Sequence, residues 1–236
     1  MQRNSYPFSR KLAALGVHLF TSSGMITGFL ALLAISHGHF REAMLWLAAC
    51  QFIDGFDGTL ARWVNVEAVL PNMSGKMIDA VVDFANYALI PAYFIYASGL
   101  IASPFNEIAV AVILLVSAMY YGKDGMISSD YYFIGFPVLW NLVAFFLYFV
   151  LGLSSMANFL LIVFLGILHF VPLKFAYPSR AKSLRWLTFP LATAGLVLAA
   201  WILWIYPETN SLMNGGMVLL LGGFGALALR DSFKRV

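Results

Sequence analysis

Long apolar stretches separated by short polar breaks make up most of the chain. About 20 mostly apolar residues are needed for an α-helix to cross the hydrocarbon core of a bilayer. Stretches near this length lie at residues 14–36, 43–62, 76–98, 105–122, 134–152, 156–173, 186–206 and 213–230. The breaks between them carry turn-forming residues, as in Ser103-Pro104 and Tyr177-Pro178-Ser179. The pattern therefore predicts an all-α fold, a polytopic membrane helix bundle with about eight transmembrane helices.

The composition agrees with a membrane protein. Of the 236 residues, 61% are hydrophobic and only 11% are charged, too few charges to cover the surface of a soluble protein. The single cysteine, Cys50, excludes a disulfide within the chain and is typical of a small apolar core residue. Since no long linker or low-complexity tract interrupts the helices, we expect one integral-membrane domain over residues 1–236.

The basic residues predict an orientation. In the eight-helix arrangement, every one of the 14 Lys and Arg residues except Arg41 falls on one side of the membrane. By the positive-inside rule this side, with the N- and C-termini, is cytoplasmic. Residues 5–13 could form a short helix lying in the membrane interface, so the N-terminal segment 1–13 is expected to be interfacial.

Four aspartates stand inside two of the apolar segments: Asp54, Asp57, Asp79 and Asp83. One carboxylate at the centre of a membrane helix costs roughly 2.5–3.5 kcal/mol, and four would cost on the order of 10 kcal/mol. The neighbouring sequence offers no comparable set of Lys and Arg. Bound divalent cations are the simplest compensation.

The spacing of the aspartates supports this interpretation. Asp54 and Asp57 are three residues apart, and Asp79 and Asp83 are four apart, so each pair shares one face of a helix. Two facing helices would form an oxygen-ligand site for Mg²⁺ or Mn²⁺, with room for two ions. Two-metal sites of this kind typically serve phosphoryl transfer. A carboxylate cluster on the ion pathway of a transporter is the alternative at this point.

A larger set of residues around the aspartates matches a family signature. The matching positions are Asp54, Asp57, Gly58, Ala61, Arg62, Gly75, Asp79 and Asp83. Their order resembles D-x-x-D-G-x-x-A-R-x8-G-x3-D-x3-D, the signature of the CDP-alcohol phosphotransferase family. Twelve residues, not eight, separate Arg62 from Gly75. This longer spacer and the stretch Val17–Thr21 are similar to the bacterial phosphatidylcholine synthase branch of the family, with the resemblance strongest over residues 17–95.

The resemblance implies a role for each matching residue. Asp54, Asp57 and Asp79 would bind metal, and Asp83 would share a metal and act as the general base. The nucleotide of CDP-diacylglycerol would be bound by Gly58, Ala61, Arg62, Gly75 and, from the first helix, Thr21. A hydroxyl bonded to the preceding helical turn is the competing interpretation of Thr21.

The resemblance also implies a reaction and a location. An alcohol attacks the lipid-side phosphorus of CDP-diacylglycerol and releases CMP. For the branch named above the alcohol is choline, which makes the enzyme a CDP-diacylglycerol–choline O-phosphatidyltransferase of the bacterial inner membrane with its active site facing the cytoplasm. Expected partners are the two substrates and membrane lipids, with no nucleic acid. The Gly24–Gly28 spacing permits close helix contact, either within the chain or in a homodimer.

The acceptor site is sought among aromatic residues, because aromatic faces bind quaternary ammonium groups. We select a group near the cytoplasmic ends of two predicted spans: Tyr120, Asp130, Tyr131, Trp140 and Asn141. An interfacial belt of Tyr and Trp would produce the same pattern without any ligand. His169 could line the same cavity or pack in the core.

Two alternatives to choline transfer stay open. The same chemistry could use serine or another alcohol, although a phosphorylated acceptor would need a compact basic pocket that the sequence does not show. A cation or amine transporter would use the aspartates as an ion site, although we see no inverted internal repeat of the kind that many transporters carry.

Overall fold

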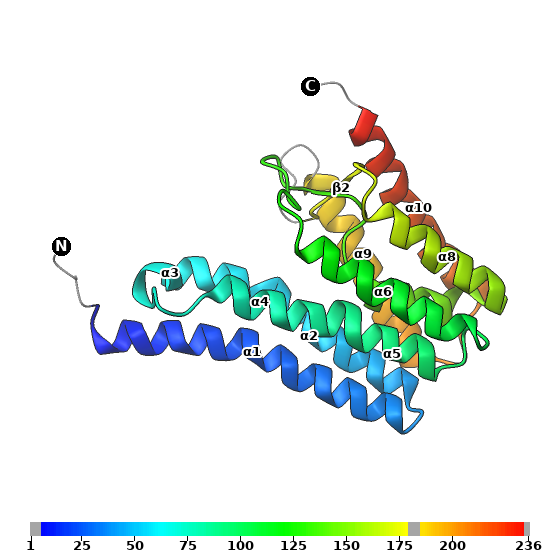
Figure 1. Ribbon diagram of the computed structural model, residues 1–236, viewed down its shortest axis with the longest axis horizontal. Coiled ribbons are helices and arrows are strands. Elements are labelled where there is room, and N and C mark those ends of the chain that lie inside the picture. The colour runs from blue at the N-terminus through cyan, green and yellow to red at the C-terminus, as the bar shows by residue number, and fades with distance from the viewer. Residues whose placement is uncertain (1–5, 179–184, 234–236) are drawn as a thin grey trace. The chain divides into compact units, whose positions relative to one another are not determined.

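The computed structural model describes residues 6–178 and 185–233, and the chain divides into two compact units, residues 1–90 and 91–236. Each unit is described by itself. The first unit, blue to cyan-green in Figure 1, is entirely helical in its described residues. It consists of α1 (Phe8–Ser36), α2 (Phe40–Val64), α3 (Val66–Val69), α4 (Gly75–Phe84) and the π-helical segment η1 (Ala85–Leu89).

Two glycines on α1 let it pack closely against α4 and η1. A Cβ atom at Gly24 would lie 2.7 Å from Val82 Cγ1, and one at Gly28 would lie 2.5 Å from Asn86 Oδ1. The Asn86 amide donates hydrogen bonds to the carbonyls of Gly24, at 3.1 Å, and Val82, at 3.0 Å. The close helix contact predicted from the Gly24–Gly28 spacing is therefore confirmed, and it lies within the chain.

The twelve-residue spacer between Arg62 and Gly75 contains the short helix α3. Val66 and Val69 of α3 are buried against Ala14 and Val17 of α1. The side chain of Ser74 accepts a hydrogen bond from a backbone N–H of the first turn of α4 and caps this helix. The spacer is thus packed onto the end of the α1–α2 pair, and it fixes where α4 begins.

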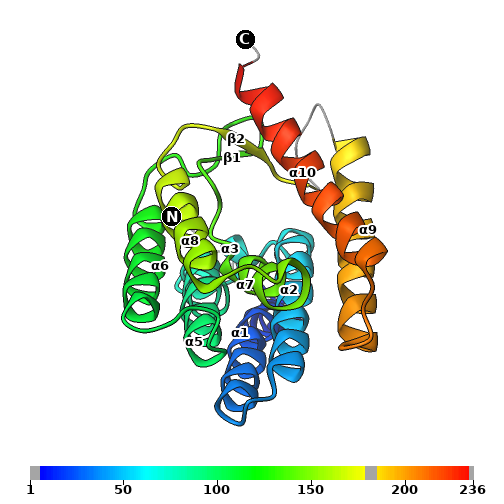
Figure 2. The ribbon, with the colours of Figure 1, turned by 90° about the vertical axis from the view of Figure 1, so that its right-hand side faces the viewer.

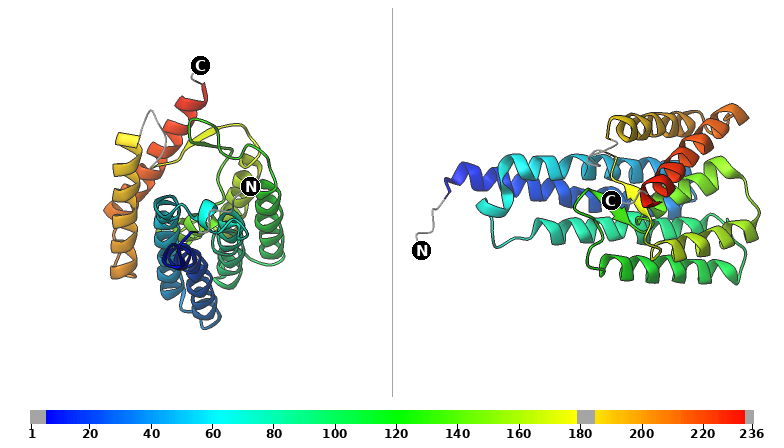
Figure 3. Two further views of the ribbon diagram at one scale, coloured as in Figure 1. Left: turned by 90° about the vertical axis from the view of Figure 1, so that its left-hand side faces the viewer. Right: turned by 90° about the horizontal axis from the view of Figure 1, so that it is seen from above.

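The second unit contains seven helical segments and two short strands in its described residues. They are α5 (Ile90–Ala97), which continues the helix of α4 and η1, α6 (Phe105–Tyr121), β1 (Tyr132–Ile134), α7 (Trp140–Phe145), the π-helical η2 (Phe146–Leu151), α8 (Ser155–Leu168), β2 (Lys174–Ala176), α9 (Arg185–Ile205) and α10 (Ser211–Phe233). β1 and β2 pair antiparallel, with Phe133 opposite Phe175. β2 packs along α10 (Figure 2), and α9 lies beside α10 (Figure 3).

The prediction of a nearly all-α membrane protein is confirmed. By length and composition, four described helical stretches could cross a membrane: residues 8–36, 75–97, 186–205 and 211–233. Shorter apolar helices cover residues 105–121, 140–151 and 155–168, and α2 is 25 residues long. The eight predicted apolar segments therefore all contain helix.

Two local expectations differ from the structure. Helix was expected from residue 134, but residues 132–134 form β1 and the helix begins at Trp140. The physical reason lies in Gly135, which has a φ of +93°, and in Pro137, which lacks a backbone N–H. Residues 8–13 are the first turns of α1 and not a separate helix, and residues 1–5 lie outside the described part of the chain.

Candidate active site

Three of the four aspartates come together in the first unit. One carboxylate oxygen from each of Asp54, Asp57 and Asp79 lies within 4.8 Å of the other two. Asp57 is buried, while Asp54 and Asp79 are half-buried. The three-residue spacing explains why Asp54 and Asp57 share one face of α2, and Asp79 of α4 completes the group.

Asp83 lies beside this group and is not one of its three members. It follows Asp79 by one turn of α4, is half-buried, and is close enough to Asp54, Asp57 and Asp79 to interact with them electrostatically. A carboxylate that shares the negative environment without belonging to the trio is suited to take up a proton.

A tyrosine that sequence reasoning missed contacts the cluster. The hydroxyl of Tyr87 in η1 donates a hydrogen bond to Asp54 Oδ2 at 2.9 Å, and the Tyr87 side chain is buried. Its place four residues after Asp83, and eight after Asp79, is a signal that could have pointed to it.

The donor atoms of the cluster suit a hard divalent cation. Mg²⁺ and Mn²⁺ prefer carboxylate, carbonyl and water oxygens, whereas structural zinc sites are built mainly from cysteine and histidine. Three carboxylates at this separation could hold one ion or bridge two, so the residues present fit the predicted metal.

The expected nucleotide-binding residues lie on α1, α2 and α4. Thr21, buried on α1, donates its hydroxyl to the carbonyl of Val17 at 3.3 Å, as the competing interpretation had it. On α2, Arg62 is exposed and donates to the Thr59 hydroxyl at 3.1 Å.

The glycine and alanine positions of the signature are only partly covered. Gly58 and Ala61 are half-buried along α2. Gly75 begins α4, and a Cβ atom there would lie 3.3 Å from Cε1 of His18 on α1. A larger residue at position 75 would thus crowd the end of α4 that leads to Asp79.

The residues chosen for the acceptor site lie in the second unit, in two separate groups of contacts. Tyr120 and Trp140 are buried around His169, with each ring centroid 5.4 Å from the imidazole centroid. Trp140 stacks on His169 and donates its indole N–H to the Ser117 hydroxyl at 2.9 Å. Asn141 is also buried. These rings are part of the protein core and do not form an exposed aromatic belt.

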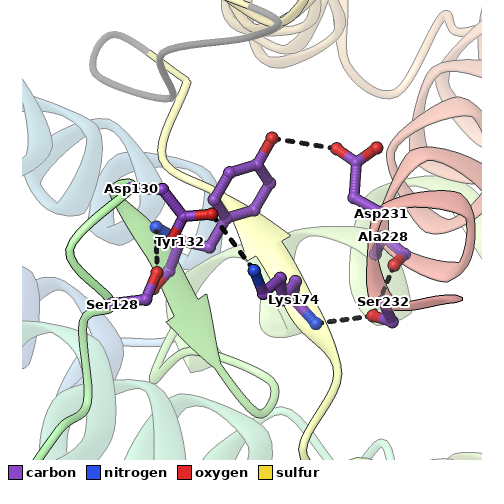
Figure 4. A network of polar contacts seen from close by, with 7 residues as sticks. All are labelled: Ser128, Asp130, Tyr132, Lys174, Ala228, Asp231 and Ser232. Atoms are coloured by element: carbon purple, nitrogen blue, oxygen red, sulfur yellow. Dashed lines mark hydrogen bonds and ion pairs between the residues drawn. The ribbon is translucent and has the colours of Figure 1, made fainter. Parts of the chain in front are cut away.

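Asp130 and Tyr131 lie in the segment before β1. The Asp130 carboxylate accepts a hydrogen bond from Lys174 Nζ at 3.1 Å (Figure 4). The pKa of Asp130 lies below its usual range because its carboxylate accepts hydrogen bonds, chiefly from the Ser128 hydroxyl and also from Lys174. Tyr131 is exposed and has a φ of +65°. Asp130 thus pairs with a cation of the protein itself.

The same region contains a polar network that the sequence did not predict. The Tyr132 hydroxyl donates to Asp231 Oδ2 at 3.0 Å, and Arg230 contacts Asp231 Oδ1 at 2.9 Å. The backbone N–H of Lys174 donates to the Ser232 hydroxyl at 2.7 Å (Figure 4). These contacts fasten the C-terminal end of α10 to the two strands.

Comparison with known proteins identifies relatives over most of the chain. The family model described as CDP-alcohol phosphatidyltransferase matches residues 18–224. A protein of Rhizobium meliloti named phosphatidylcholine synthase is 38% identical over 209 residues, which cover 88% of this chain and 86% of the relative. Proteins with the same name are 37% identical in Agrobacterium fabrum, covering 84% of this chain and 82% of the relative, and 39% identical in Bradyrhizobium diazoefficiens, covering 95% and 81%.

Proposed function

We propose, from the premise that the chain belongs to the CDP-alcohol phosphatidyltransferase family, that it transfers the phosphatidyl group of CDP-diacylglycerol to choline and releases CMP. The observation that carries this proposal is the convergence of Asp54, Asp57 and Asp79 at the family's signature positions. The choice of choline is supported by the relatives named phosphatidylcholine synthase, which match the chain over most of its length.

In the proposed reaction, the choline hydroxyl oxygen forms a bond to the lipid-side phosphorus of the diphosphate. The bond from this phosphorus to the CMP oxygen breaks, and CMP leaves. Asp83 takes the hydroxyl proton, because it lies beside the three clustered carboxylates without being one of them. Asp54, Asp57 and Asp79 would hold two divalent cations, Mg²⁺ or Mn²⁺, and Asp83 would lie at the edge of this metal site. The cations would reduce the charge of the diphosphate and stabilise the departing phosphate.

The nucleotide is proposed to lie against the first unit. The residues assigned to it are Gly58, Ala61, Arg62, Gly75 and Thr21. The small side chains of Gly58 and Ala61 allow close approach to α2, and exposed Arg62 can contribute a guanidinium group to phosphate oxygens. Thr21 could exchange its helical hydrogen bond for one to the ligand.

The acceptor is proposed to be bound in the second unit by Tyr120, Asp130, Tyr131, Trp140 and Asn141. Aromatic faces attract a quaternary ammonium group, and exposed Tyr131 offers one directly. Since Asp130 pairs with Lys174, its carboxylate would act on choline only after a change of partner.

The proposal includes a membrane arrangement. The chain forms one domain over residues 1–236 that crosses the bacterial inner membrane eight times, with both termini and the active site on the cytoplasmic side. The asymmetry of Lys and Arg supports this orientation. Five of the basic residues used for it lie outside the described part of the chain: Arg3, Arg180, Lys182, Lys234 and Arg235. Homodimers could form through small residues of α10.

The test is CMP release from CDP-diacylglycerol by the purified protein with Mn²⁺, with and without choline, and with the lipid products separated. We expect choline-dependent CMP and a new zwitterionic lipid, and neither product from an Asp83→Asn variant. If CMP forms only with serine, then serine is the acceptor in place of choline, and the proposed phosphatidyl transfer is unchanged. If no alcohol yields CMP and proteoliposomes that contain the protein take up choline or metal ions, the protein is a transporter.

A further inference from the structure

We propose that Tyr87 is a positioning residue that holds the Asp54 carboxylate in its metal-binding orientation. This inference rests on the proposed function, since it concerns the same metal site. The Tyr87 hydroxyl donates to Asp54 Oδ2 at 2.9 Å across the space between η1 and α2. Only 4% of Tyr87 is exposed, so water has little access to compete for this bond.

The π-helical geometry of η1 explains how Tyr87 reaches this position. In a regular α-helix a residue eight positions after Asp79 would be rotated by about 80° away from it around the helix axis. The wider turn of residues 85–89 lessens that rotation, so Tyr87 points to α2 as Asp79 does. Single π-helical turns inside α-helices are frequent at functional sites.

The neighbouring residue shows that this direction is fixed by packing. Asn86 is 1% exposed and points to α1, where its amide donates to the Gly24 carbonyl at 3.1 Å. Two successive residues of η1 are therefore bonded to two different helices. These two hydrogen bonds hold the backbone of η1 in register with both α1 and α2.

A donor on a ligating carboxylate restricts its rotation without using up its capacity for metal. A carboxylate has two oxygens and about four lone-pair positions, and the Tyr87 hydroxyl occupies one of them. Hydrogen bonds to metal ligands typically orient the ligand, and their loss typically lowers metal affinity or activity 10–100-fold. We therefore assign to Tyr87 an effect on metal affinity and not on the chemical step.

The experiment compares Tyr87→Phe with the wild type by two measurements. Mn²⁺ binding to the purified protein is titrated directly from the electron paramagnetic resonance signal of free Mn²⁺, and CMP release is measured over a range of Mn²⁺ concentrations. We expect Mn²⁺ affinity about 10-fold lower in both, with most of kcat recovered at saturating Mn²⁺. The matched control is Tyr93→Phe, which removes the hydroxyl of an exposed tyrosine further along the same helix and should change neither.

Two further results decide the matter. In an Asp54→Asn background, Tyr87→Phe should add almost nothing, because Tyr87 acts through Asp54. If Tyr87→Phe leaves the Mn²⁺ affinity unchanged, with or without a lower melting temperature, then the tyrosine only packs in the core. The positioning role would then be refuted, and the proposed choline transfer would not be affected. If Mn²⁺ affinity drops as expected but the wild type makes no CMP with any alcohol, Tyr87 keeps its role and the proposed function fails.

Discussion

The contact of Gly28 with η1 gives a prediction about what positions the aspartates. In Gly28→Ala the new Cβ would lie 2.5 Å from Asn86 Oδ1 and 2.8 Å from Ile90 Cδ1, both closer than real Cβ contacts. Ile90 can change rotamer, but Asn86 is fixed by its hydrogen bond to Gly24. The helices must therefore separate, and α4 must move relative to α1.

The magnitude follows from two destabilising effects and one that offsets them. Overpacking of a buried contact typically costs about 1–3 kcal/mol. Alanine is more favourable than glycine inside a helix by about 1 kcal/mol, which offsets part of this cost. Loss of the Asn86 hydrogen bond adds about 1 kcal/mol. The expected net loss of about 1–3 kcal/mol corresponds to a decrease in melting temperature of about 2–12 °C for a chain of this size.

The assay is thermal unfolding in detergent, followed by tryptophan fluorescence, together with Mn²⁺ affinity. Gly16→Ala is the matched control, because Gly16 lies on the same helix and a Cβ there would meet nothing within 4 Å. We expect Gly16→Ala to equal or exceed the wild type in melting temperature, and Gly28→Ala to lose both stability and Mn²⁺ affinity. Equal melting temperatures for the two variants would refute the claim that the Gly28 contact holds α4 in place.

Four other substitutions test separate parts of the structure. Asp57→Asn should weaken Mn²⁺ binding itself, whereas Asp83→Asn should abolish CMP release and still bind CDP-diacylglycerol; equal loss of binding in both would contradict this division of roles. Gly135→Ala should sharply reduce the yield of folded protein, measured by size-exclusion chromatography, because its φ is +93° and a Cβ would collide with the carbonyl group of His169. Asp130→Asn should lower the melting temperature at neutral pH. The pKa of Asp130 is lowered in the folded state from its usual 3.8. The carboxylate therefore stabilises the fold above pH 3.8, and this stabilisation is lost as the pH falls through the folded-state pKa. The melting temperatures of the wild type and Asp130→Asn should thus converge in acid.

The sequence predicted the first unit well because its signals are local. A three-residue or four-residue spacing places two carboxylates on one helical face wherever the helix lies, and the pairing of Asp54 with Asp57 in the cluster follows from it. Tyr87 was missed although it follows Asp83 by four residues, because its eight-residue separation from Asp79 fits the α-helical period poorly and η1 changes that period. The packing of α3 on α1 was also missed, since four helical residues carry almost no periodic signal.

The second unit was predicted less well because its contacts join distant parts of the chain. β1 and β2 are three residues each, too short to show an alternating pattern, and the whole of residues 135–173 separates them in the sequence. Composition could identify Asp130 as a candidate ligand for a cation. It could not reveal that Lys174, which had been explained by the positive-inside rule, is the cation that Asp130 contacts.

The clustered carboxylates also explain why packing on α1 matters for the site. Two unit charges 4.8 Å apart, the upper limit of the separations in the cluster, repel each other by about 3 kcal/mol at an effective dielectric constant of about 20, and three such pairs would reach about 10 kcal/mol. This is as large as the whole stability of a typical domain, about 5–15 kcal/mol. The repulsion pushes α2 and α4 apart whenever the three groups are ionised without a counter-charge. Attraction within the cluster therefore cannot be what assembles it. The glycine contacts on α1 fix α4 and η1 against α1, and a cation bound by the carboxylates would relieve the repulsion between them.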